Sequence, residues 1–468
     1  MPNRHPEALP PDETPPRRSA LPRPARLPPL LTSFACWSAA LTLLSLAYSY
    51  SMGHFAGLLY PYAFPLFHAD KPFWDFTVFQ LRFQHFHTPA FWDPYNYPFT
   101  YPAPTALAFA AFYAFHHALR IYQTVCGLAL AAGAALLTRG LVRAGVPAAA
   151  ALLFSAVVIA TSWPLGYLFN RANIEGLVAI IAALGLLAIL YRRPWIGATL
   201  IGIAGSMKIF PAILLALLLS RRRYKEFAWG CASALLVTAL SLKIIGPSGT
   251  QAWRHVSSGL RFFQEQWAGN LMLTEVGFDH SAFTLIKIPF VIVDALRHGL
   301  LHDPGPDGTY PLLMTSAWPR LQIVLRLYVA GTALAGVALY FLRIRRLPML
   351  NQLLVLSVCA VLLPPVSFDY TLVHLLLPFG LLCIYAADQW RSRIHVPGLR
   401  AVMACFVAVS TAGGFVTWHF RWAGQLRAIA LLTLLYALLR SPFAPRSGST
   451  LPPELQDPDP PTRPPSAA

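Results

Sequence analysis

The sequence predicts an all-α integral membrane protein, a helical bundle that crosses the bilayer about 10–12 times. Composition is the first observation behind this prediction, because only 12% of the 468 residues are charged and 56% are hydrophobic. A soluble globular chain carries about 25% charged residues, so half of the usual solvating side chains are missing. The second observation is the recurrence of apolar segments of roughly 20 residues, the length that spans a hydrocarbon core. A soluble protein is therefore excluded.

The apolar segments follow one another from residue 30 to residue 440. They lie near 30–52, 103–119, 121–138, 147–168, 174–191, 195–219, 227–246, 321–342, 349–364, 371–387, 399–418 and 424–439. The first segment is far from the start of the chain and lacks a small-residue cleavage site. We expect it to be a retained anchor and not a removed signal peptide.

Basic residues set the expected orientation. The net charge is +17, and the arginines stand in short clusters between apolar segments, which is a topology signal and not a nucleic-acid patch. The clusters at 17–18, 221–225, 343–346, 391–393 and 440 place both ends of the chain in the cytosol. The expected location is the inner (cytoplasmic) membrane, with many passes and with membrane lipids, not nucleic acid, as partners.

Two arginine pairs conflict with strict alternation of the spans. It would leave Arg139 with Arg143, and Arg192 with Arg193, on the outer side. Both conflicts disappear if 103–119 enters the membrane without crossing and 195–219 forms a re-entrant hairpin. That hairpin would break near Lys208 and Pro211. The sequence leaves both layouts open.

The predicted domain organisation is one polytopic membrane domain, 30–440, between two proline-rich tails, 1–29 and 441–468. The tails are expected to be disordered in the cytosol, because they cannot bury enough apolar surface to offset their ordering entropy. Two long segments, 53–102 and 247–319, are expected on the outer side, and the second contains a predicted interfacial helix at 281–299. Function is usually carried by such long segments with interspersed polar residues.

Several chemical classes lack their sequence signals. The six cysteines all lie in apolar stretches without CxxC spacing, so neither a disulfide framework nor a zinc site is indicated. The chain also lacks GxxxxGK[ST], HExxH, GxSxG and DxD motifs. No nucleotide site and no cofactor are expected, and a metal ion is left open.

The first long segment is rich in aromatic residues, with 16 in the 42 residues from Tyr60 to Tyr101. They could form an interfacial aromatic belt or a platform for a sugar or a prenyl chain. Asp75 stands in this apolar setting, where an acid is costly unless it is paired or functional. A catalytic role for Asp75 is one reading, and a structural role is the other.

Polar residues also interrupt the apolar helices. Arg171, Asn173 and Glu175 lie at a hinge in FNRANIEG, where Arg171 and Glu175 could merely neutralise each other as an i,i+4 pair. Lys208 has apolar neighbours on both sides, so it could bind a phosphate or extend to an interface.

Two later segments add candidates. GNLMLTEVGFDH offers Asn270, Asp279 and His280. PPVSFDYTLVH offers Asp369, Tyr370 and His374, of which Asp369 and His374 need not share a helix face. A lone histidine is more often structural than functional.

The order of these motifs resembles glycosyltransferase family 87, polyprenyl-phosphate-mannose-dependent enzymes with a GT-C fold. The resemblance runs from about residue 30 to 390 and is most specific in the YPAP and KIFPAILLALLLSRRR segments. The family's loop aspartate matches Asp75, its hinge asparagine Asn173, its membrane lysine Lys208, and its late histidine His374. The chain departs from the family's pattern at 171–172, where Arg-Ala replaces Gly-Gln, and at 103, where Ala replaces a frequent Pro.

The resemblance implies a membrane hexosyltransferase. It would move a hexose, mannose, from a polyprenyl-phosphate sugar to a lipid or glycan acceptor on the outer face of the membrane. Asp75 and His374 are the predicted catalytic residues, and the predicted substrate-binding residues are Lys208, Asn173, Arg171, Tyr101 and Asn270. The alternative is a polytopic transporter or lipid-linked-sugar flippase with its substrate at the membrane midplane. The unequal loop lengths and the acid in the aromatic segment favour the enzyme, and the absence of an internal repeat weakens the case for an inverted-repeat transporter.

Overall fold

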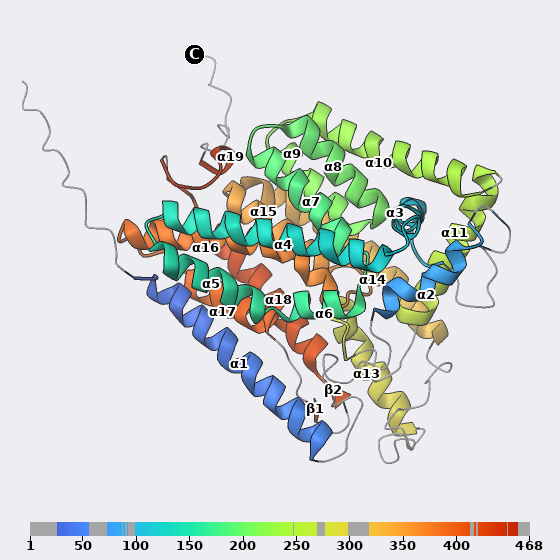
Figure 1. Ribbon diagram of the computed structural model, residues 1–468, viewed down its shortest axis with the longest axis horizontal. Helices are drawn as coiled ribbons and strands as arrows, with labels where there is room; N and C mark the ends of the chain where they lie inside the picture. Colours follow the sequence, from blue (N-terminus) through green and yellow to red (C-terminus); the bar gives the residue numbers. More distant parts are fainter. Residues whose placement is uncertain are drawn as a thin grey trace, which may run out of the picture.

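The computed structural model describes residues 26–55, 73–86, 88, 91, 99–246, 248–268, 277–297, 318–411, 416–417, 420–446 and 448–456. Almost all of the predicted tail 1–29 lies outside these residues, as does much of the segment 53–102. The architecture is a helical bundle (Figure 1). The one sheet within the described residues is an antiparallel pair, β1 (Val416–Thr417) and β2 (Phe420–Arg421).

Six described helical segments are long and apolar enough to cross a membrane. They are α1 (Pro29–His54), α4 (Ala118–Arg143), α10 (Tyr224–Ile245), α14 (Trp318–Leu342), the joined η6 (Asp369–Leu375) and α16 (Leu376–Arg391), and α18 (Ala423–Arg440). A bent pair, α5 (Ala148–Ala160) and α6 (Trp163–Arg171), makes a seventh if it is one span. The multi-pass all-α class is thus confirmed.

The count by length is lower than the predicted 10–12, because six further apolar segments are only 10–17 residues long. They are α3 (Ala103–Tyr113), α7 (Glu175–Leu190), α8 (Pro194–Met207), η3 (Phe210–Leu215) with α9 (Ala216–Ser220), α15 (Met349–Leu362) and α17 (Leu399–Ser410). At 1.5 Å per residue, an 11-residue helix such as α3 is about 16 Å long, half of a hydrocarbon core. Hydropathy identifies such segments without giving their length.

The region 195–219 is a helical hairpin. The helix α8 ends at Met207, the backbone of Lys208 is extended, and the chain turns back so that Gly205 packs on Ala212. The helix α10 then runs in the same direction as α8, with Trp229 Nε1 donating to Thr199 Oγ1 at 2.8 Å. The start of α8 and the start of α10 are therefore at the same end, and so are Arg192, Arg193 and the 221–223 cluster.

The other conflicting arginine pair lies at this same end. Helix α4 begins beside the hinge at 173, and Gly145, just after its last residue Arg143, lies against the side chain of Arg391. The 11-residue α3 is shorter than a membrane span, and both arginine pairs lie at one end of the bundle, as the second of the two layouts requires. Figure 1 shows this arginine-rich end at the left and α2 (Trp74–Phe83) and α11 (Gly249–Phe263) at the right.

Close helix packing depends on small residues. An added Cβ at Gly185 would meet Ile201 at 2.8 Å, and one at Gly202 would meet the carbonyl oxygen of Gly230 at 2.4 Å. These glycines bring α7, α8 and α10 together, as is usual where apolar helices pack in lipid. Helix α15 lies at the centre, and all of its residues are buried. These contacts fix the hinge and the break at Lys208 relative to each other.

The predicted disordered tail 441–468 does not begin at residue 441. Residues 441–446 and 448–456 fold back onto the arginine-rich end, where Phe443, Leu451 and Leu455 are buried. There α19 (Pro453–Gln456) presents Glu454 to Arg223 at 3.0 Å. The prediction failed because it rested on the high proline content. It gave no weight to three apolar residues that are buried and to one glutamate that pairs with an arginine. Residues 457–468 lie outside the described part of the chain.

Helices also occur in the two long segments. The predicted helix at 281–299 is present as α13 (Ala282–Arg297). The second long segment also contains α11, with a π-helical turn at Gln264–Ala268, and the first contains α2. A short 3₁₀ turn, Ile344–Arg346, follows α14.

Candidate active site

A break between two helices forms the centre of the candidate site. Helix α6 ends at Arg171, Ala172 has a left-handed backbone with φ of 48°, and α7 begins at Glu175. The side chain of Asn173 accepts from the backbone N–H of Glu175 at 3.0 Å, which holds the start of α7. The Tyr122 hydroxyl donates to the carbonyl of Asn173. The break therefore points neighbouring polar side chains in different directions.

Asp75 lies in the first turn of α2 and meets this hinge. Its carboxylate accepts from Arg171 Nη2 at 2.5 Å and from Asn173 Nδ2 at 2.7 Å. The same Asn173 nitrogen lies 3.4 Å from the Tyr101 hydroxyl. The Asp75 side chain is 13% exposed and that of Arg171 is 35% exposed, so this ion pair is open to a ligand.

Packed aromatic rings hold Asp75 in place. Phe76, Phe79, Phe83, Phe91 and Phe99 are buried against one another and against α3. These five rings form a core, so neither the aromatic belt nor the sugar platform describes them. Their burial fixes α2 and hence the position of the carboxylate.

Glu175 is fully buried and joins two other predicted residues. It accepts from Lys208 Nζ at 2.5 Å and lies 2.6 Å from His374 Nε2. Lys208 projects from the break after α8, and its nitrogen is 5.4 Å from the centre of the Tyr101 ring and 5.2 Å from that of Tyr370. A cation beside two aromatic faces gains electrostatic stabilisation.

Two interpretations from the sequence are wrong. Arg171 and Glu175 do not neutralise each other, because the helix breaks between them and each pairs with a different partner. Lys208 is not a lone membrane charge, because Glu175 is its counter-ion. An i,i+4 rule applies only along a continuous helix.

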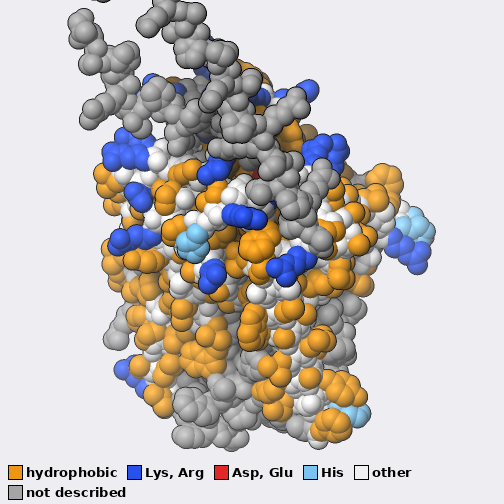
Figure 2. Space-filling model, turned by 90° about the vertical axis from the view of Figure 1, so that its left-hand side faces the viewer, with side chains coloured by type: hydrophobic (Ala, Val, Ile, Leu, Met, Phe, Trp, Pro, Cys, Tyr) orange, Lys and Arg blue, Asp and Glu red, His pale blue; other side chains and the backbone are white. Residues whose placement is uncertain are grey.

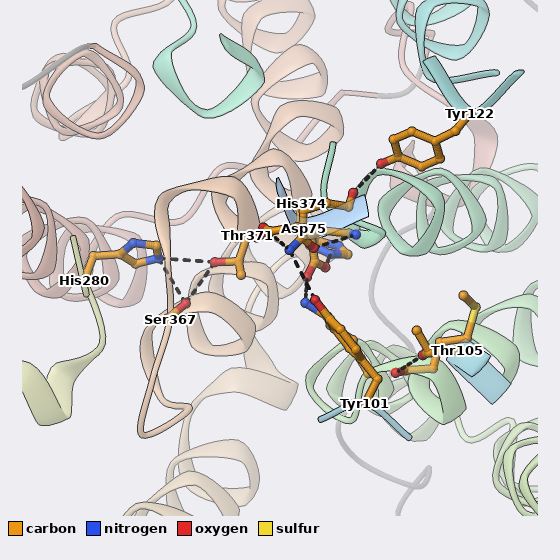
Figure 3. Close-up of polar contacts among 12 residues, drawn as sticks. Asp75, Tyr101, Thr105, Tyr122, His280, Ser367, Thr371 and His374 are labelled. Atoms are coloured by element: carbon orange, nitrogen blue, oxygen red, sulfur yellow. Dashed lines mark hydrogen bonds and ion pairs between the residues drawn. The ribbon is translucent and has the colours of Figure 1, made fainter. Parts of the chain in front are cut away.

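The structure brings together six of the seven predicted site residues, from five separate parts of the chain. They are Asp75, Tyr101, Arg171, Asn173, Lys208 and His374. Figure 3 shows the side chains of Asp75, Tyr101 and His374 gathered in one place. Asn270 lies outside the described residues.

Sequence reasoning missed one contributor to this cluster, Tyr122, which holds the hinge carbonyl of Asn173. The ring of Tyr370, which the sequence did single out, lies beside Lys208. Glu175 also has a larger part than expected, since it links two other site residues. Tyr122 carries no signal in the sequence, because its partner is a backbone atom of another helix.

A second polar cluster lies apart from the first. Asp369 accepts from Trp163 Nε1 at 2.5 Å and from Arg427 Nη1 at 2.8 Å, while His280 Nδ1 is 3.5 Å away. His280 also contacts Ser367 and Thr371, as Figure 3 shows. Asp369 and His374 thus serve different clusters, in line with the expectation that they need not share a face.

Within the residues that the structure describes, no group of three or more His, Cys, Asp and Glu side chains is placed to hold a metal ion. The site instead offers two carboxylates, two cations and one histidine. Such a set can accept a proton, stabilise an anion and orient a polar substrate.

Comparison with known proteins decides the family. The model of glycosyltransferase family 87 matches residues 99–367, more than half of the chain. The chain belongs to this family. The matched region contains the hinge and Lys208, while Asp75 and His374 flank it.

One curated relative covers most of this family 87 chain. It is the polyprenol-phosphate-mannose-dependent alpha-(1-2)-phosphatidylinositol pentamannoside mannosyltransferase of Mycobacterium tuberculosis (strain CDC 1551 / Oshkosh), 24% identical over 360 residues, or 72% of each chain. No solved structure matches.

Family membership and the apolar helices together make this protein a membrane glycosyltransferase. The transporter alternative is thereby set aside. The two substitutions at 171–172 also have a structural counterpart, because Arg171 supplies the partner of Asp75 and Ala172 occupies the left-handed position.

Proposed function

We propose that this protein transfers a hexose, mannose, from a polyprenyl-phosphate sugar to a lipid or glycan acceptor. The observation that carries the proposal is the cluster of Asp75, Arg171, Glu175, Lys208 and His374. The donor class is the one for which the mycobacterial relative is named. A lipid-borne donor also suits a chain that lacks nucleotide-binding motifs.

Asp75 is the proposed general base. It takes the proton of the acceptor hydroxyl, whose oxygen attacks the anomeric carbon of the sugar opposite the leaving phosphate. The bond from the anomeric carbon to the phosphate oxygen breaks, and the electron pair stays on that phosphate. Arg171 and Asn173 orient the carboxylate, and its remaining lone pairs can accept from the substrate.

Charge balance explains the proposed role of Lys208 and His374. Asp75 and Glu175 offset Arg171 and Lys208, so the substrate-free cluster is neutral when His374 is neutral. Breaking the bond from the sugar to the phosphate adds a negative charge to the leaving group. Lys208 and His374 stabilise that charge where little water is present.

The proposed orientation places the catalytic cluster at the outer face and the arginine-rich end, with both ends of the chain, in the cytosol of the inner membrane. The arginine clusters support it. In a Cys36→Ser background, Thr88→Cys should react with an impermeant thiol reagent in intact cells, while Ala444→Cys should react only after lysis. Labelling of Ala444→Cys alone in intact cells would reverse the orientation.

Transfer is tested directly with purified protein. It is incubated with polyprenyl-phosphate mannose labelled in the sugar, together with a membrane lipid extract, and products are separated by chromatography. We expect labelled glycolipid to form, with unlabelled polyprenyl-phosphate mannose competing and a nucleotide-linked mannose failing to compete. Transfer from polyprenyl-phosphate glucose alone would retain the enzyme class and refute mannose. Labelled donor that crosses vesicle membranes unchanged would support the transporter.

A further inference from the structure

A large groove opens at the arginine-rich end, away from the catalytic cluster. Its volume is about 1230 Å³, and it lies between the start of α1, the end of α16 and the start of α17. Small-molecule pockets usually have about 300–1000 Å³, so the groove has room for a headgroup and the first part of its chains. Neither the family match at 99–367 nor the catalytic cluster includes any residue of this groove.

The rim of the groove is basic. Arg26, Arg391, Arg393 and Arg400 line it, together with His395, and no Asp or Glu is among its lining residues. None of the four guanidinium groups has an ion-pair partner within the described part of the chain. Figure 2 looks at this end of the molecule and shows Lys and Arg side chains with almost no acidic ones. Among the described residues, the groove therefore has four positive charges and no counter-ion.

The inner wall of the groove is apolar. Residues Leu30, Phe34, Met403 and Val407 line it along α1 and α17. From Leu30 to Trp37 the groove follows α1 for seven residues, which is about 10 Å. Trp37 is 63% exposed at that end. The basic rim matches the headgroup of a phospholipid, and the apolar wall along the helices matches its acyl chains.

Backbone geometry distinguishes Arg393 from an ordinary surface arginine. It follows α16 with φ of 56°, and Ile394 N–H bonds back to the carbonyl of Gln389 at 3.0 Å. Glycine is the usual residue at this position of a helix end, because other side chains are strained there. Here the position carries a cation that lines the groove.

Two other helices at the same end stop in the same way. Arg192 after α7 and Arg222 after α9 have φ of 61° and 58°. A cation beside a helix C-terminus interacts well with the helix dipole, which offsets part of the strain. Arg222 is not a lining residue of the groove, so it offers a matched control for Arg393.

We propose that this groove binds an anionic phospholipid of the leaflet that the arginine-rich end faces. The lipid phosphate lies among Arg26, Arg391, Arg393 and Arg400, and the acyl chains lie along α1 and α17. Basic recesses between helices on the cytoplasmic side are suited to anionic headgroups. The inference is independent of the transfer reaction.

Native mass spectrometry of the protein in neutral detergent tests the site, with phosphatidylglycerol and phosphatidylcholine as probes. The wild type should prefer phosphatidylglycerol by at least tenfold. Arg393→Gly should lower that affinity about fivefold, the effect expected for one basic residue near a lipid headgroup. Arg222→Gly removes the same charge from the same kind of helix end and should leave the affinity unchanged.

Folding is controlled within the same design. Because glycine suits the backbone at 393, Arg393→Gly should melt at the wild-type temperature or above it in phosphatidylcholine alone. Three outcomes would overturn the proposal: no preference for phosphatidylglycerol, an equal loss in Arg222→Gly, or full displacement of the lipid by millimolar inorganic phosphate. The last would assign the site to free phosphate. The combined variant Arg391→Gln, Arg393→Gly and Arg400→Gln should reduce binding to the phosphatidylcholine level.

Discussion

The two polar clusters use similar residues in different settings. Around Asp369, the carboxylate and His280 are both 0% exposed, and Arg427 is 2% exposed. Around Asp75, the carboxylate is 13% exposed and Arg171 is 35% exposed, and Lys208 beside Glu175 is 15% exposed. Each cluster pairs acids with cations, but only the Asp75 cluster is open to a ligand.

Burial therefore distinguishes the charged residues that stabilise this fold from those that can act on a substrate. The Asp369 cluster joins α6, η6, α18 and the segment before α13, and its groups bond to one another. Ion pairs enclosed in this way are costly to break because the remaining charge has no solvent. The Asp75 cluster keeps accessible carboxylate and guanidinium groups, which can interact with a substrate.

The largest expected effect is on stability, and it comes from breaking the buried ion pair between Arg427 and Asp369. Arg427→Met leaves the Asp369 carboxylate with a buried charge, so we expect a loss of about 3–5 kcal/mol in stability. Thermal unfolding in detergent measures it. Arg427→Met combined with Asp369→Asn should recover part of the loss. A melting temperature within a few degrees of wild type for the single variant would contradict this view of the cluster.

Asp75→Asn tests the open cluster. It keeps the size of the side chain and removes proton acceptance, so transfer should fall by about 10²-fold or more while the protein still folds and binds donor. Asp75→Glu should retain a trace, because its carboxylate is about one methylene out of place.

The matched control for Asp75→Asn is Asp388→Asn. Asp388 accepts from Thr450 at 2.9 Å at the opposite end of the molecule, so its loss should cost some stability and little turnover. Equal turnover in the two variants would assign Asp75 a structural role.

Lys208 tests whether one charged group can both pair with a buried carboxylate and act on a substrate, since its partner Glu175 is fully buried. Lys208→Met should fold, because His374 still contacts Glu175, yet transfer should fall by about tenfold through weaker stabilisation of the phosphate. Lys208→Arg should retain part of the activity. Steady-state kinetics with varied donor separates donor binding from turnover, and unchanged transfer in Lys208→Met would exclude the phosphate role.

The smallest expected effect is that of Tyr122→Phe, which removes the hydroxyl bonded to the hinge carbonyl of Asn173. One such hydrogen bond contributes about 1 kcal/mol to stability, and we expect transfer to fall only several-fold as the hinge loosens. Tyr340→Phe is the control, because the Tyr340 hydroxyl donates to the carbonyl of Ala216, the first residue of α9, at 2.8 Å and far from the hinge. A loss of transfer in Tyr340→Phe as well would show a general effect of packing.

The sequence was sufficient for features that depend on local composition. Apolar segments predicted the multi-pass class, and the resemblance in KIFP and YPAP predicted the family that the comparison shows. The break at Lys208 also followed from a charge and a proline in an apolar run. Each signal lies within a few residues of the feature that it predicts.

Pairing was decided by the tertiary structure. Glu175 was assigned to Arg171 because they are four residues apart, yet its partners are Lys208 and His374, 33 and 199 residues away. Arg427 gave no signal as the partner of Asp369, and the anchors after residue 441 were hidden among prolines. Coulomb attraction and burial depend on distance in space, and that distance is set only when α6, α7, α8 and η6 pack together.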